Sequence, residues 1–418
     1  MISQDSPYLG WPGRRRLSVG NQLALTFYWF PNNVLWTGLL LIVMPAKVIS
    51  LVGMGASTSH LSMAQFIGDA AAVLAAPIFG AISDRWRTRV GRRRPQMIVG
   101  VIGNVIFFLI MGFATNFTAF VIGFVGVQIF NNVTGSAYAG LIPDLVPPEQ
   151  RGLASGFMGI WNNAAVLVGA GLALALAGMG YWFATAVLLL LGVAITFFFV
   201  REPAPPGVEP FRLGAFLRGF WIVGREYRDF WWVFATRFLV MMGLYVLEYF
   251  LSYYLRFVMH IANPNQDIFL ILAMLTVTAL LSVLLAGYIS DRLGKRKILV
   301  SIAGVLMGAC SLLFVFMHSL SGIFVAALLF GIGYGTYLST DYALVVDTLP
   351  GKMAAKDMGI WGLSTTVPQI LSAILGLSIA SLVIPHFGYS AGYRLMFAIT
   401  FVLFLLGSIL VWKVKKVA

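Results

Sequence analysis

Two copies of one short motif, each at the end of a long apolar run, divide this chain into related halves. The segments Gly80–Arg85 and Gly287–Arg292 share the pattern Gly-x-x-Ser-Asp-Arg. Each leads into a basic segment, Gly91–Pro95 in the first half and Gly294–Lys297 in the second. The two copies begin 207 residues apart in a chain of 418 residues, so their spacing predicts a duplicated body.

A second repeated block supports the duplication. Met158–Trp161 has the sequence Met-Gly-Ile-Trp, and the same four residues return as Met358–Trp361. Each block follows an apolar run that ends in an aspartate, Asp144 or Asp347, and then a proline-containing turn. Two ordered blocks with similar offsets indicate duplication more strongly than either tetrapeptide alone.

The composition is that of a membrane protein. Hydrophobic residues make up 60% of the chain and charged residues only 10%, whereas a soluble domain carries about 25% charged residues. Since about twenty apolar residues cross a bilayer as a helix, we predict an all-α membrane protein with about twelve transmembrane helices in two pseudo-symmetric six-helix lobes. The predicted spans are Gly20–Met44, His60–Ser83, Gln96–Ala114, Phe117–Ile142, Leu153–Ala177, Tyr181–Val200, Phe230–Val258, Asp267–Ser290, Ile298–Met317, Gly322–Val345, Met358–Val383 and Tyr389–Trp412.

The net charge is +13, but the basic residues are distributed along the chain as in a membrane protein and not as in a nucleic-acid-binding protein. Of the 28 Lys and Arg residues, 24 lie at the two termini or in every second loop, which predicts that both termini and those loops are cytoplasmic. These 24 residues are Arg14–Arg16, the arginines of Arg85–Arg94, Arg151, the arginines of Arg201–Arg228, Arg292–Lys297, Lys352, Lys356 and Lys413–Lys416. The short loops favour a bacterial inner membrane.

The domain organisation follows from the same pattern. We expect an N-terminal lobe at 1–200, a cytoplasmic linker at 201–229 and a C-terminal lobe at 230–418. The linker opens with the helix-breaking segment Glu202–Gly207, and its second part mixes aromatic residues with arginines. That second part is either an amphipathic helix on the inner leaflet or a partly ordered linker.

Metal and disulfide chemistry are not expected. Cys310 is the single cysteine, and the four histidines are far apart in sequence. No disulfide framework or thiolate cluster can form from one cysteine, and the histidines lack the spacing of a metal site. We therefore expect no cofactor.

Polar side chains recur on one face of every third span. They lie at the spacing i, i+3, i+4, i+7, which places them on one side of a helix. They are Trp29, Asn32, Asn33 and Trp36 in the first span; Gln128, Asn131 and Asn132 in the fourth; Tyr245, Glu248 and Tyr249 in the seventh; and Tyr334, Tyr337 and Asp341 in the tenth. We predict that the four faces line one central cavity that binds the substrate. The alternative for any single Asn or Gln is a hydrogen bond that holds two helices together.

Four ionisable residues lie well inside predicted spans. Arg237 and Asp341 should reach a similar depth of roughly 10 Å at 1.5 Å rise per residue, so we predict an ion pair between them. Its role is either structural compensation or gating and coupling. Asp69 and Glu248 have no obvious partner in the sequence. A buried carboxyl without a counter-charge can exchange protons near neutral pH, which makes both candidates for proton coupling. The alternative is a carboxyl that is held neutral or bonded to a neighbouring Ser, Thr or Tyr.

The repeated loop motif predicts a latch at the cytoplasmic face. Asp84 and Asp291 lie at the C-terminal ends of their spans, where the helix dipole disfavours a carboxylate. We therefore expect arginines or the N-terminus of another helix to supply the compensating positive charge. Gly80 and Gly287, one turn earlier, would let a neighbouring helix approach closely. The alternative is that these charges only set topology. The candidate gating residues are Gly80, Asp84, Arg85, Gly91, Arg92, Arg93, Gly287, Asp291, Arg292, Asp144 and Asp347.

This arrangement resembles the major facilitator superfamily over nearly the whole chain. Within that superfamily, several motifs are similar to those of the sucrose–proton symporters and their bacterial relatives, and more loosely to those of the glycoside–pentoside–hexuronide cation symporters. The motifs are Ser83–Arg85 with Gly91–Pro95, Asn131-Asn132 followed by Asp144, and Asp341–Leu344 with Asp347 and Pro350. The resemblance implies two six-helix lobes and transport by alternating access.

The chain departs from these relatives at their coupling positions. Gln128 stands where plant sucrose carriers have an acidic residue, and Ala139 stands where they have an arginine. Ala72 and Ala76 align with the sodium-binding carboxylates of the melibiose-type relatives. The resemblance therefore extends to the fold and not to sucrose, sodium or the coupling scheme.

The function predicted from these observations is secondary active transport. A monomer in the lipid bilayer would move a small polar solute, such as a sugar or glycoside, by proton-coupled symport. A proton-coupled exporter of an amphipathic compound is the first alternative, although Gly156–Gly171 lacks the glycine-proline signature of drug antiporters. A non-transporting membrane sensor is the alternative from another class, and a membrane enzyme is disfavoured because no catalytic cluster is evident. The sequence does not identify the solute, the coupling ion or the direction of transport.

Overall fold

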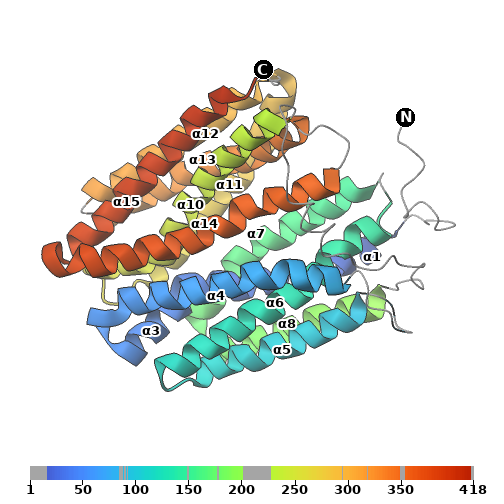
Figure 1. The fold of residues 1–418 in the computed structure, drawn as a ribbon, viewed down its shortest axis with the longest axis horizontal. Coiled ribbons are helices and arrows are strands. Elements are labelled where there is room, and N and C mark those ends of the chain that lie inside the picture. The colour runs from blue at the N-terminus through green and yellow to red at the C-terminus, as the bar shows by residue number, and fades with distance from the viewer. Residues whose placement is uncertain are drawn as a thin grey trace. The chain divides into compact units, whose positions relative to one another are not determined.

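A computed structural model describes residues 17–83, 88, 91, 93–147, 150–176, 178–200, 227–293, 295–317, 319–348 and 354–415 (Figure 1). These residues form helices and turns and contain no β-strand, apart from an isolated bridge between Thr88 and Gly91. The helices are α1 (Val19–Thr26), α2 (Trp29–Gly38), the π-helical turn η1 (Leu39–Val43), α3 (Met44–Val52), α4 (Met54–Ser83), α5 (Arg94–Phe113), α6 (Phe117–Leu145), α7 (Arg151–Ala175), α8 (Met179–Phe199), α10 (Arg228–Phe257), α11 (Asn265–Leu293), α12 (Arg296–Phe316), α13 (Leu320–Thr348), α14 (Ala354–Leu382), α15 (Ile384–Leu410) and the 3-10 turn η4 (Val411–Lys413).

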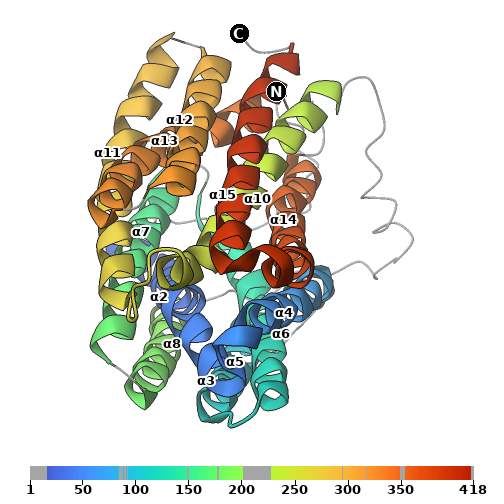
Figure 2. The same ribbon diagram turned by 90° about the vertical axis from the view of Figure 1, so that its left-hand side faces the viewer.

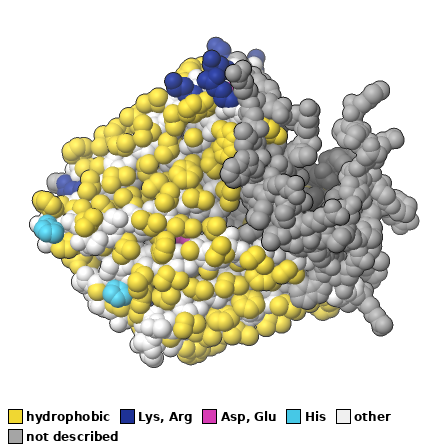
Figure 3. All heavy atoms as spheres, viewed as in Figure 1, with side chains coloured by type: hydrophobic (Ala, Val, Ile, Leu, Met, Phe, Trp, Pro, Cys, Tyr) yellow, Lys and Arg dark blue, Asp and Glu magenta, His cyan; other side chains and the backbone are white. Residues whose placement is uncertain are grey.

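The prediction of an all-α membrane protein is confirmed. Among the described residues, 12 helical segments are long and apolar enough to cross a membrane. In Figure 3, hydrophobic side chains cover most of the described surface in view, and most of the visible Lys and Arg side chains gather at one end. The predicted linker at 201–229 lies outside the described residues up to position 226.

The first span is longer than predicted. The expected end at Met44 is wrong, because the helical segment continues from Val19 to Val52. The π-helical turn η1 passes into α3 without a break, and Pro45 lies in the first turn of α3. Proline lacks a backbone amide hydrogen, and the π-helical turn η1 directly before α3 is the local irregularity that accompanies it.

The chain divides into two compact units, each described by itself. Unit 1 comprises Met1–Trp36, Ala70–Leu172 and Leu176–Pro210. Unit 2 comprises Thr37–Asp69, Ala173–Ala175 and Phe211–Ala418. The first half of α4 thus belongs with the C-terminal helices, and the lobe boundaries at 1–200, 201–229 and 230–418 stay a prediction.

In unit 1, α5 packs along α6 and α8, and α1 packs on α8. Buried polar groups tie these helices together. The Tyr181 hydroxyl in α8 donates to the Leu35 carbonyl at 2.9 Å, and the Tyr28 and Tyr138 rings stack with centroids 4.6 Å apart. These contacts hold α2, which carries the first predicted polar face, against the body of the unit.

In unit 2, α13 packs along α11 and α12, and α10 packs along α14 and α15. Figures 1 and 2 both show α12 and α15 side by side. Hydrogen bonds join the segment 37–69 to α15. The Thr58 and Tyr393 hydroxyls lie 2.6 Å apart, and the Tyr389 hydroxyl donates to the Gly55 carbonyl at 2.9 Å. The start of α4 is therefore an integral part of this unit.

One close approach of two helix backbones in unit 2 is at Gly335 of α13. A Cβ atom at this position would lie 2.2 Å from the Ala279 carbonyl oxygen of α11, so only glycine permits the contact. Gly362 of α14, in contrast, has open space around it.

We expect Gly335→Ala to lower stability by about 1–3 kcal/mol, because the new methyl group forces two backbones apart. Gly362→Ala is the matched control and should be neutral or stabilising, since alanine is the better helix former. The measurement is the midpoint of thermal unfolding of the purified protein in detergent. Equal midpoints for the two variants would contradict the packing described for α11 and α13.

Candidate functional site

The predicted polar face of the first span is formed by α2 in unit 1. Its four members, Trp29, Asn32, Asn33 and Trp36, are all half-buried, whereas Val34 and Leu35 between them are fully buried. The Asn33 side chain donates to the Trp29 carbonyl at 2.8 Å and to Asn162 Oδ1 of α7 at 2.7 Å. Asn162 was not predicted, although its position next to the repeated Trp161 block was available as a signal.

The predicted face of the fourth span is formed by α6. Asn131 and Asn132 are half-buried and Gln128 is buried. The Asn104 side chain of α5 donates to Asn131 Oδ1 at 3.4 Å, and Asn132 donates to the Gln128 carbonyl at 2.9 Å within its own helix. For Asn131 the structure therefore supports the alternative of a contact between helices.

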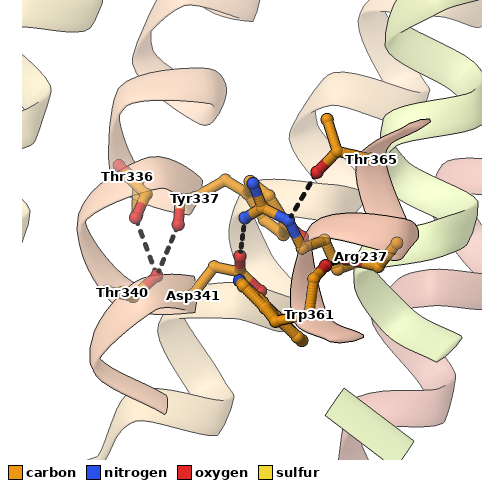
Figure 4. Close-up of polar contacts among 8 residues, drawn as sticks. Arg237, Thr336, Tyr337, Thr340, Asp341, Trp361 and Thr365 are labelled. Carbon is orange, nitrogen blue, oxygen red and sulfur yellow. Dashed lines mark hydrogen bonds and ion pairs between the residues drawn. The ribbon is translucent and has the colours of Figure 1, made fainter. Parts of the chain in front are cut away.

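The predicted ion pair between Arg237 of α10 and Asp341 of α13 is present (Figure 4). The guanidinium Nη1 donates to Asp341 Oδ2, and its Nε donates to Thr365 Oγ1 of α14 at 3.3 Å. The guanidinium carbon lies 5.0 Å from the Trp361 ring centroid, also on α14. The Asp341 side chain is fully buried and that of Arg237 is 17% exposed, so the pair joins three helices away from solvent.

A second polar group in unit 2 joins α4 to α10. The Tyr249 hydroxyl donates to Asp69 Oδ2 at 2.9 Å, which is the alternative of a carboxyl bonded to a neighbouring tyrosine. The sequence does not indicate which tyrosine bonds Asp69, because the two residues are far apart along the chain. Glu248 is half-buried and lies within electrostatic range of Asp69.

Tyrosines connect the two polar groups within unit 2. Tyr245 is within electrostatic range of both Glu248 and Arg237, and so is Tyr334 of α13. The Tyr245 and Tyr249 ring centroids are 6.0 Å apart. Tyr337 is fully buried near Asp341. The faces predicted for the seventh and tenth spans thus meet in one network, which we call the carboxyl–tyrosine network (Asp69, Glu248, Asp341, Arg237, Tyr245, Tyr249, Tyr334 and Tyr337).

Gln65 belongs beside this network and was missed by the sequence analysis. It lies one helical turn before Asp69 on α4, so the two share a face. It is fully buried, and neither its Oε1 nor its Nε2 has a hydrogen-bond partner among the described residues. A glutamine inside an apolar span, four residues from an aspartate, was a usable signal.

Most of the predicted latch lies outside the described residues. This holds for Asp84, Arg85 and Arg92 and for the side chains of Asp144, Asp291 and Asp347. Arg292 is exposed and donates to the Tyr288 hydroxyl at 3.2 Å, within its own helix. Gly91 adopts a positive φ of 121°.

Among the described residues, no helix approaches Gly80 closely. A Cβ atom there would meet nothing within 4 Å, and one at Gly287 would only contact Ser339 Oγ at 3.4 Å. Tight packing is found instead deeper along the helices, as at Gly335. Arg93 is buried. Its guanidinium lies against Gly140 of α6, in the space that a larger side chain there would fill.

The chain belongs to the major facilitator superfamily, which its sequence matches over residues 23–373 and, in an overlapping second match, over 264–418. The members of this superfamily with this fold are secondary transporters, and this chain is accordingly a membrane transporter. No curated protein matches the sequence significantly.

Solved structures of transporters share the fold. A peptide transporter, POT, aligns with a TM-score of 0.74 at 13% identity, covering 96% of this chain and 97% of the other. The nucleoside transporter NupG aligns with a TM-score of 0.72 at 13% identity, covering 93% and 99%. A bacterial homologue of the human lysosomal transporter Spinster, inward-facing and occupied, aligns with a TM-score of 0.71 at 16% identity, covering 95% and 96%.

We expect Arg237→Gln to cost about 3–5 kcal/mol of stability, because it leaves the buried Asp341 carboxylate uncompensated. Adding Asp341→Asn should recover much of that loss, since the double variant carries no unpaired charge. Thermal unfolding and membrane yield are the measurements. Arg256→Gln is the matched control, because Arg256 lies on the same helix and bonds only the exposed Ala262 carbonyl. Additive losses in the double variant would mean that the pair is not energetically coupled.

Proposed function

We propose that this transporter moves a small polar solute by proton-coupled symport and alternating access. The carboxyl–tyrosine network carries the proposal, because ionisable groups inside membrane spans are costly and mark substrate and proton pathways. Glu248 is its central member: it is half-buried, and among the described residues no hydrogen bond or ion pair engages its carboxyl. A proton is the simplest charge that such a group can take up and release.

The N-terminal half supplies features that suit a sugar or glycoside. On α2, the half-buried Trp29 and Trp36 offer ring faces for stacking, and Asn32 offers an amide for hydroxyl groups. This is the proposed substrate-binding face, together with Gln128, Asn131 and Asn132 of α6. The tyrosines of the network are the proposed substrate-binding residues of unit 2. Two lobes at 1–200 and 230–418 would open the substrate pathway alternately to either side of the membrane.

The proposal places a monomer in a bacterial inner membrane with both termini cytoplasmic, as the distribution of basic residues favours. The repeated loop motif would form its cytoplasmic latch. The alternative is a proton-coupled exporter of an amphipathic compound, which would use the same carboxyls.

The experiment is transport by the purified full chain in liposomes without ATP. Sugars, glycosides and amphipathic compounds are first screened by thermal shift at two pH values, and the compounds that stabilise the protein are labelled. A carrier exchanges labelled for unlabelled solute across the membrane, which a sensor or an enzyme does not. No exchange of any stabilising compound would refute the proposed transport.

We expect Glu248→Gln to retain solute exchange and to lose accumulation driven by a pH gradient, because a glutamine binds the solute without carrying a proton. The Asp267→Asn variant is the matched control, since Asp267 is a carboxylate in the first turn of α11 and outside the network. It should retain both activities. Gradient-driven accumulation by Glu248→Gln at the wild-type rate would remove Glu248 from the coupling mechanism.

A further inference from the structure

Basic side chains from three segments of unit 2 gather at one end of its helices. α10 begins at Arg228, α12 begins at Arg296, and η4 ends at Lys413. Figure 3 shows Lys and Arg side chains at the end where Figure 1 places the C-terminus. We call this group the basic end patch, and its members are Arg228, Lys295, Arg296, Lys297, Lys413 and Lys415.

Hydrogen bonds hold the three segments against one another. The Lys415 amide donates to Asp229 Oδ2 of α10 at 3.1 Å, and the Lys297 side chain at the start of α12 donates to the Val414 carbonyl at 3.1 Å. Val414 itself is buried. The segment that follows α15 is therefore fixed on α10 and α12, and its lysines lie beside the basic residues of those helices.

The basic end patch carries an excess of positive charge. Arg228, Lys295, Lys413 and Lys415 are exposed, and none of these side chains forms an ion pair with another described residue. Asp229 is the acidic residue in the contacts above, and its Oδ2 accepts the Lys415 amide. The patch is thus complementary in charge to an anionic partner.

Apolar side chains are exposed directly next to the patch. The Trp412 indole donates to Ser301 Oγ of α12 at 3.1 Å, and the Trp412 side chain is 56% exposed. Ile298 and Ile302 lie on either side of Ser301 along the chain, one helical turn apart, and both are exposed. α12 is long and apolar enough to cross a membrane, and tryptophan is enriched at the level of the lipid headgroups. The surroundings therefore suit a partner that has an anionic head and apolar chains.

We propose that the basic end patch binds the headgroup of an anionic phospholipid, whose acyl chains lie against Trp412, Ile298 and Ile302. A soluble anion would use the charges and leave the apolar side chains uncovered. A zwitterionic lipid would cover the apolar side chains and leave the excess charge uncompensated. The inference does not depend on which solute the transporter carries.

The test is native mass spectrometry of the purified full chain in detergent. Dioleoylphosphatidylglycerol and dioleoylphosphatidylcholine are supplied in equal amounts, because they share their acyl chains and differ in headgroup charge. We expect phosphatidylglycerol to be retained about tenfold more than phosphatidylcholine, since each basic residue near a membrane surface contributes about fivefold in affinity for anionic lipid. Glycerophosphoglycerol, the same headgroup without chains, should bind far more weakly than the lipid.

The variants separate the patch from general binding of lipid. Lys295→Gln and Lys413→Gln each remove one exposed charge, from two different segments of the patch. Each should lower the preference for phosphatidylglycerol about fivefold, and the double variant should lower it further. Arg256→Gln is the matched control, because Arg256 is a basic residue in the last turn of α10, and it should keep the wild-type preference. The midpoint of thermal unfolding checks that each variant is folded.

Three results overturn the proposal: the wild type retains both lipids equally, the double variant keeps the wild-type preference, or glycerophosphoglycerol binds as tightly as the lipid. The last result would identify a site for a soluble anion. The liposome exchange assay reads out a different property, so a failure of the lipid site leaves the proposed transport intact, and a failure of transport leaves the lipid site intact.

Discussion

The polar interior of unit 2 depends on one constraint, which is the cost of placing charge where no water can solvate it. Arg237 and Asp341 meet this cost together, since each supplies the counter-charge of the other and the guanidinium also contacts Thr365 and Trp361 of α14. The pair and these contacts join α10, α13 and α14. A charge that is paired in this way can be buried without a change of protonation.

The second pair of ionisable residues in this unit is of another kind. Asp69 and Glu248 have the same charge, and Tyr249 is the hydrogen-bond donor seen between α4 and α10 at this point. Like charges repel more strongly where the dielectric constant is low, so Asp69 and Glu248 interact in a different way from Arg237 and Asp341.

The transmembrane helices and the ion pair could be predicted from residue spacing. The helices follow from apolar runs of the required length, and the Arg237–Asp341 pair follows from equal depth in two spans. The contact of Tyr249 with Asp69 could not be predicted in the same way, because it depends on which helices are neighbours. Asn131 lies on the predicted polar face of α6, and the structure adds a hydrogen bond from Asn104 of α5 that the spacing alone does not predict.

The sequence by itself determined the membrane class, the duplication and the depth of each charged residue, because hydropathy and helical rise act along the chain and require no knowledge of neighbours. Only the tertiary structure decided that the first half of α4 packs with the C-terminal helices. That packing brings Asp69 to the Tyr249 hydroxyl of α10, and it arises from contacts such as Thr58 with Tyr393 between residues more than three hundred positions apart. Side-chain fit between distant segments is a property of the folded surfaces, which no local pattern records.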